Sequence, residues 1–227
     1  MSELPYAKIA AQGPDAFEFL QNQLAADLRG LDAGETRLSA WCNPKGRVIC
    51  LLRVRAADGG FALLLPAELG DEFLRRLSTF RFRAKVELDS APASDEDLGL
   101  SQPLDEWRLA NLRAGVVEIG AAQSEAFTPH MLNLDLLGAV SLEKGCYPGQ
   151  EIVARTHYRG ATKRRCLRFE SHNPVSPGAK VSDGTRDVGE VVNAIGTDLL
   201  AVVPLDMAEA DLRIDGIVLS RRPLPYL

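Results

Sequence analysis

The stretch that says most about this chain covers residues 144–155 and reads Lys144-Gly145-Cys146-Tyr147-Pro148-Gly149-Gln150-Glu151-Ile152-Val153-Ala154-Arg155. Its closely spaced glycines and proline predict a backbone that turns sharply. A helical turn predicted over 150–156 places Cys146 just before a helix N-terminus, where the helix dipole favours an anion. Lys144 and Arg155 add positive charge nearby in the sequence. These surroundings favour a reactive or metal-binding thiolate, and a small apolar residue filling a turn is the alternative interpretation.

The other three cysteines have different neighbours. They alternate with the apolar residues of predicted strands, which predicts that they lie in the core: Cys42, Cys50 and Cys166. No two cysteines have the CxxC spacing of a metal site, and no HxxxH or HExxH pair occurs among His130, His157 and His172. We therefore expect no stably bound metal. A catalytic pair of Cys146 with His157 requires the fold to bring the two side chains together.

The composition is that of an ordinary globular protein. The 227 residues are 46% hydrophobic and 25% charged, and 26 basic against 31 acidic residues leave a net charge of −5. This balance excludes a wholly basic nucleic-acid-binding protein, although not a local basic patch. Residues 1–5 lack the pattern of a secretory signal, and no apolar run approaches about 18 residues, so we expect a cytoplasmic protein.

The spacing of apolar residues predicts mixed helices and strands. In the first half we expect helices over 14–28 and 69–77, and strands over 36–42, 48–54, 61–65 and 83–88. The acid-rich segment 89–106 is predicted as a solvated loop, with a short helix entering at 103–112. A further short helix is predicted over 127–140. After residue 163 the short strands and turns have the composition of a small β-barrel.

Several motifs together carry a resemblance to a known family. The segments are Phe127-Thr128-Pro129, Asn133-Leu134-Asp135, the run from Lys144 to Arg155, and Trp41-Cys42-Asn43-Pro44-Lys45-Gly46-Arg47. They closely resemble the signature of the YgfZ family, folate-binding relatives of the glycine-cleavage T-protein (an aminomethyltransferase) that are implicated in iron–sulfur cluster assembly or repair. The resemblance extends over nearly the whole chain, and the KGCYPGQE core is its most specific part.

The resemblance implies an α+β fold of the T-protein type, a cloverleaf of three modules around a central folate channel. An N-terminal folate-binding module is expected to combine residues 1–45 with 113–157. A ferredoxin-like α+β module is expected over 46–112, and a C-terminal β-barrel over 158–227.

The resemblance also implies the site. Cys146 carries over as the functional residue, and its supporting residues are Lys144, Tyr147, Gln150, Glu151 and Arg155. Tetrahydrofolate is the expected cofactor, with contacts from Trp41, Asn43, Lys45, Arg113 and Asn133. The partners implied are iron–sulfur assembly proteins or client enzymes, with tRNA as a further candidate. The thiolate of Cys146 is then a transient cluster ligand, because one cysteine cannot hold a stable cluster alone.

The sequence departs from true aminomethyltransferases at Asn111-Leu112-Arg113-Ala114-Gly115. Those enzymes carry a pterin-binding glutamate just before the Ala-Gly step, where this chain has Arg113, and no match to their catalytic aspartate motif is evident. Whether the chain is an enzyme stays open. One alternative is a tetrahydrofolate-dependent aminomethyl or methyl transferase linked to tRNA modification. Another is a non-catalytic scaffold that uses basic residues, such as Lys163, Arg164 and Arg165, to recruit an acidic partner.

Overall fold

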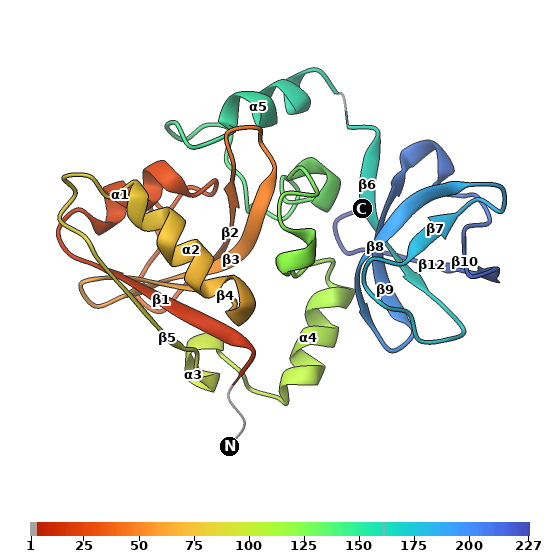
Figure 1. Ribbon diagram of the computed structural model, residues 1–227, viewed down its shortest axis with the longest axis horizontal. Coiled ribbons are helices and arrows are strands. Elements are labelled where there is room, and N and C mark those ends of the chain that lie inside the picture. The colour runs from red at the N-terminus through yellow and green to blue at the C-terminus, as the bar shows by residue number, and fades with distance from the viewer. Residues whose placement is uncertain (1–3, 161) are drawn as a thin grey trace. The chain divides into compact units, whose positions relative to one another are not determined.

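The computed structural model describes residues 4–160 and 162–227, and its chain divides into two compact units (Figure 1). The first unit comprises residues up to 101 with 119–129 and 138–154, and the second comprises 102–118, 130–137 and 155–227. The interpretation of residues 1–5 as lacking a secretory signal involves residues 1–3, which lie outside the described residues. Within the described ranges, none of the helices has the length and apolar character needed to cross a membrane.

An antiparallel five-stranded sheet is the centre of the first unit. Its strand order is β2-β3-β4-β1-β5. The bounds are β1 (Tyr6–Gln12), β2 (Thr36–Cys42), β3 (Val48–Ala57), β4 (Gly60–Pro66) and β5 (Glu87–Pro92). β1 pairs with both β4 and β5 even though β2 and β3 separate it from them in sequence. The strands predicted over 36–42, 48–54 and 61–65 are therefore confirmed, as β2, β3 and β4.

Two helices, α1 (Ala16–Gln23) and α2 (Ala67–Thr79), contribute to the core of this unit. On α2, Leu69, Phe73 and Leu77 recur every fourth residue and are buried, as expected for one face of an amphipathic helix. The ring of Phe73 meets that of Trp41 edge to face, with centroids 4.8 Å apart. The predicted helix over 69–77 is confirmed, and this aromatic pair joins it to β2.

The first predicted helix is shorter than expected. It was expected over 14–28, but α1 ends at Gln23 and Leu24 has an extended backbone with ψ of 150°. The chain then runs beside β2: Leu24 forms an isolated bridge with Trp41, and the Ala25 N–H donates to the carbonyl of Ala40. Because pairing with β2 also buries Leu24 and Leu28, the apolar spacing there reflects an extended segment rather than another helical turn.

The segment from 83 to 106 also differs from the prediction. The strand expected over 83–88 lies at β5, and the expected loop over 89–106 contains the end of β5 and helix α3 (Asp95–Leu98). Its acidic residues are tolerated because β5 lies at the edge of the sheet, where side chains remain exposed. Ser94 and Asp97 form a capping box that starts α3. The helix expected at 103–112 is confirmed as α4 (Leu104–Arg113).

The helix expected over 127–140 is not formed. A single 3-10 turn, η2 (His130–Leu132), occurs there, and η1 (Ala121–Gln123) precedes it. Asn133 follows with a φ of +59°, a left-handed conformation that stops helical propagation. The apolar residues of this stretch are buried through turns instead, including Leu132 and Leu134.

The second unit contains the small barrel-like sheet. Its seven strands have the order β11-β10-β7-β8-β9-β6-β12. The bounds are β6 (Arg164–Glu170), β7 (Lys180–Ser182), β8 (Asp187–Ile195), β9 (Asp198–Pro204), β10 (Arg213–Ile214), β11 (Ile217–Val218) and β12 (Ser220–Arg222), with η3 (Leu205–Met207) after β9. Helix α4 contacts β8 and β9. The α+β class and the C-terminal barrel are confirmed, whereas the boundaries of the three modules stay a prediction.

The aromatic pair gives a test of the first unit's core. Replacing Phe73 by alanine removes a side chain that is only 2% exposed and should destabilise the protein by about 3–5 kcal/mol. The matched control is Phe82→Ala, because Phe82 is 89% exposed and should cost little. Urea unfolding followed by circular dichroism measures both. Equal losses in the two variants would contradict this description of the core.

Candidate functional site

The four cysteines fall into two chemical classes. Cys42, Cys50 and Cys166 are buried, as the sequence predicted, whereas Cys146 is exposed. Burial raises the pKa of the Cys42 and Cys166 thiols to about 12 and also raises that of Cys50, because a low-dielectric interior disfavours the thiolate. Among the described cysteines, Cys146 is therefore the one that solvent and reagents reach.

The loop that carries Cys146 is held by close backbone contact with the β2–β3 turn. Helix α5 (Gln150–Tyr158) begins after Gly149, as expected, so Cys146 lies shortly before its N-terminus. Gly149 has a φ of +81°, and a Cβ on it would lie 2.4 Å from the carbonyl oxygen of Asn43 and 2.8 Å from the nitrogen of Gly46. Only glycine permits this approach, which explains one of the motif's glycines.

Lys144 fixes the other side of the loop. Its ammonium group donates to the carbonyl oxygens of Gln21, Leu24 and Ala26, at 2.5, 2.6 and 2.9 Å. These carbonyls are at the end of α1 and in the segment after it, so the side chain ties the cysteine loop to that turn. Burial lowers the pKa of Lys144 to about 8, and at neutral pH the ammonium form still predominates. The positive charge of Lys144 therefore serves to bind these three backbone carbonyl groups.

The remaining motif residues differ in burial. Tyr147 is buried, its hydroxyl has no hydrogen-bond partner, and burial raises its pKa. Gln150 donates from its side-chain amide to the Lys144 carbonyl at 3.3 Å, which closes the loop on itself. Glu151 is exposed in the first turn of α5, where its charge suits the helix dipole, and Arg155 is exposed further along. The roles of these residues in chemistry stay predictions.

The β2–β3 turn is stabilised by Asn43, one of the expected folate contacts, together with Glu125, which the sequence did not single out. The side-chain oxygen of Asn43 accepts from the N–H groups of Lys45 and Arg47, and its amide donates to Glu125 at 2.6 Å. Glu125 also accepts from Arg76 at 2.7 Å, and this bond, together with that from Asn43, holds its pKa low. No local spacing links these positions, so only the tertiary fold reveals the network.

Three of the expected folate contacts lie on or beside β2 in the first unit. Trp41 is buried against Phe73, so its ring belongs to the core, and its indole nitrogen lacks a hydrogen-bond partner. Asn43 is engaged in the turn, while Lys45 is exposed at its tip. Of these three, the ammonium group of Lys45 is the polar group most open to a ligand.

The other two expected contacts lie in the second unit, where each contacts other residues of that unit. Arg113 forms an ion pair with Asp198 at 2.8 Å, and Asp198 also accepts from Arg168 at 2.7 Å. Asn133 is fully buried and donates to the carbonyl of Cys166 at 2.7 Å. The side chain of Asn133 is thus used in an internal contact, whereas that of Arg113 stays 53% exposed beside its ion pair. A folate site built from all five residues stays a prediction.

Comparison with known proteins shows which sequences this chain is similar to. No family model matches the chain. It is 29% identical to the "tRNA-modifying protein YgfZ" of Klebsiella pneumoniae, over 97% of this chain and 90% of that protein. It is also 29% identical to an uncharacterized protein of Haemophilus influenzae, over 97% of this chain and 95% of that one. This chain is thus similar in sequence to YgfZ proteins over nearly its whole length. The resemblance seen in the motifs is thereby confirmed.

A solved structure has a fold similar to that of this chain. The glycine cleavage system aminomethyltransferase T from Bartonella henselae matches with a TM-score of 0.75. The match covers 98% of this chain and 84% of that one, at 18% sequence identity. This chain therefore has a T-protein-like α+β fold, as expected from its sequence.

The glycine contact gives a prediction with an internal control. Gly149→Ala should destabilise the protein by about 1–3 kcal/mol more than Gly138→Ala, because the added Cβ meets backbone atoms. Gly138 also has a positive φ, +68°, but a Cβ added there would have nothing within 4 Å, so this variant reports the conformational cost alone. Thermal unfolding measures both variants, and equal melting temperatures would refute the close docking of the loop.

The ammonium contact predicts a second effect. Lys144→Met should destabilise the protein by about 3 kcal/mol, because three carbonyl groups lose their donor while the aliphatic chain is kept. Lys45→Met, at an exposed lysine, should change stability by less than about 0.5 kcal/mol. Urea unfolding of the two variants provides the comparison. A stable Lys144→Met variant would show that the contact contributes nothing to the fold.

Proposed function

We propose that this YgfZ relative is a cytoplasmic, folate-binding accessory factor in the assembly or repair of iron–sulfur clusters, acting through Cys146. The observation that carries the proposal is the contrast among the cysteines. The three buried thiols are shielded and have raised pKa values, while the exposed thiol lies on a loop fixed by Lys144 and Gly149. A fixed and accessible thiol is suited to meeting a partner's reactive group.

The number of available thiols limits what this site does. Iron–sulfur clusters normally require four protein ligands, and Cys146 is the single exposed cysteine among the described residues. The thiolate therefore acts as a shared, transient ligand, with the remaining ligands supplied by an iron–sulfur assembly protein or a client enzyme. This arrangement suits a protein that delivers or repairs clusters better than one that stores them.

Tetrahydrofolate is the cofactor that we propose, on the basis of the T-protein-like fold and the resemblance to YgfZ proteins. Lys45 offers an exposed ammonium group to the anionic glutamate tail of folate. Arg113, at the position where aminomethyltransferases carry a glutamate, is instead paired with Asp198. This difference favours an accessory role over aminomethyl transfer.

The second candidate is a tetrahydrofolate-dependent aminomethyl or methyl transferase linked to tRNA modification. It is favoured by the name of several relatives, which calls them tRNA-modifying proteins. Both candidates have a connection to tRNA if the client of the accessory factor is an iron–sulfur enzyme that modifies tRNA. Folate-dependent turnover with tRNA as acceptor distinguishes the transferase from the accessory factor.

The scaffold alternative is less well supported. It requires basic side chains to be available to an acidic partner. Arg165 pairs with Asp135 at 2.7 Å, and Arg164 donates to the carbonyl of Val188 at 2.7 Å. Two of the three residues that it depends on are thus used inside the second unit.

Cys146→Ser tests the leading proposal. In the folded wild-type protein a thiol reagent should modify one cysteine per chain, and in the variant none, because the other three are buried. In cells that lack the natural protein, the variant should fail to restore the activity of iron–sulfur enzymes that modify tRNA. Cys166→Ser is the matched control: it should keep the labelling at Cys146 and restore activity if it folds. Full activity of Cys146→Ser would overturn the proposal.

A further inference from the structure

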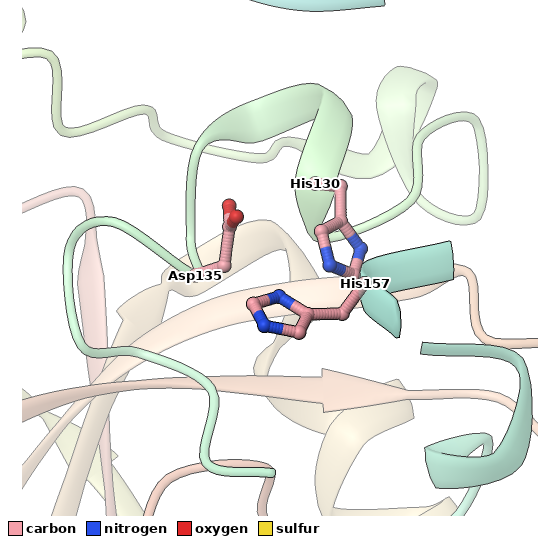
Figure 2. Close-up of side chains that lie close together, drawn as sticks. All are labelled: His130, Asp135 and His157. Carbon is pink, nitrogen blue, oxygen red and sulfur yellow. The ribbon is translucent and has the colours of Figure 1, made fainter. Parts of the chain in front are cut away.

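Two histidines and an aspartate, which no sequence motif links, have their side chains close together in the second unit. His130 belongs to η2, Asp135 follows it in the same turn region, and His157 is in the last turn of α5. One possible ligand atom from each residue lies within 4.8 Å of the other two, and the centroids of the two imidazole rings are 5.9 Å apart (Figure 2). Their sequence separations match no common metal motif, so only the fold reveals the group.

His130 is the unusual member. Its side chain is 1% exposed, yet neither ring nitrogen has a hydrogen-bond partner. A buried polar group without a partner costs free energy, so such groups in proteins are usually satisfied by a neighbour, a water molecule or an ion. Burial also lowers the pKa of His130, which favours the neutral imidazole that binds metals. The unpartnered ring of His130 lies beside the ring of His157. A ligand bound between these two residues would supply the missing partner.

The carboxylate of Asp135 is held in place close to the two histidines. Arg165 donates to both of its carboxylate oxygens, at 2.7 and 3.0 Å, and also to the carbonyl oxygen of His130 at 3.2 Å. A carboxylate oxygen can accept more than one interaction, so this pairing leaves room for an ion. Outer contacts of this kind commonly fix the carboxylate ligands of metal ions. Arg165 therefore fixes the carboxylate of Asp135 relative to the backbone of His130.

We propose that His130, Asp135 and His157 bind a divalent transition-metal ion, with zinc as the ion that fits best. Two imidazoles and one carboxylate form a familiar zinc ligand set, in which water or a small ligand takes the fourth position. Ligand atoms around tetrahedral zinc are about 3.4 Å apart, so the three groups must draw together on binding. The ring of His157 provides this movement, because it is exposed on the helix while His130 is fixed in the interior.

The proposed site goes beyond the proposed function and does not depend on it. Cys146 is a competing ligand for zinc, since thiolates bind this ion strongly. Every measurement is therefore made on the full chain carrying Cys146→Ser, which removes the exposed thiol. Metal is first removed with a chelator and the protein is dialysed. Zinc binding is then followed by titration calorimetry, and Co²⁺ absorption reports the ligand geometry.

The expected result is one zinc ion per chain and a raised melting temperature with zinc, because an ion that binds the folded state stabilises it. His157→Ala should weaken binding at least about tenfold and should fold normally, since His157 is exposed. His130→Ala and Asp135→Asn should have the same effect on binding. The matched control is His172→Ala, an exposed histidine outside the group, which should bind zinc like the parent.

Two results would overturn the inference. One is the absence of stoichiometric zinc binding in the Cys146→Ser chain, which would mean that water or a rearranged side chain satisfies His130. The other is equal affinity of the His157→Ala and His172→Ala variants, which would place any bound ion elsewhere. Because the cysteine is absent throughout, neither result bears on the proposed role of Cys146.

Discussion

A single buried ammonium group, that of Lys144, organises the part of the first unit that carries the exposed cysteine, Cys146. Lys144 satisfies three carbonyl groups where α1 gives way to extended chain. Without that donor, the end of the helix would leave acceptors buried and unpaired. The same lysine begins the cysteine loop, so the geometry of the loop follows from the geometry of the helix end. The cost of burying the charge is offset by these three bonds.

The second fixed point of the loop is a contact between two glycines. Gly149 and Gly46 bring the backbones of the loop and the β2–β3 turn together, and the turn is itself held by Asn43 and Glu125. Cys146 is thus exposed on a loop that Lys144 and Gly149 anchor on either side of it. The exposure of its thiol on this anchored loop separates it from the three cysteines of the core.

Much of the fold could be predicted from the sequence, and the elements that were missed depend on contacts between distant residues. The helix α2, the β2–β3 hairpin, the start of α5 and the burial of three cysteines follow from local spacing and composition. The early end of α1 and the position of β5 depend on pairing with distant strands, which local patterns do not contain. The expected supporting role of Lys144 followed from resemblance, whereas its actual contacts require the fold. The group around His130 escaped prediction because its three residues share no regular spacing.

The segments of the two units alternate along the chain, and this order affects both cleavage and synthesis of the protein. Each unit is assembled from three separate segments, and the chain passes between the units at residues 101/102, 118/119, 129/130, 137/138 and 154/155. A single cut anywhere in the chain therefore cannot release either unit intact. During synthesis, the first unit lacks its last segment until residue 154 has left the ribosome, so the cysteine loop is among the last parts of that unit to be added. The first unit thus has all of its segments before residues 155–227 of the second unit are made, and the exposed thiol is held in place only once residues 138–154 have been added.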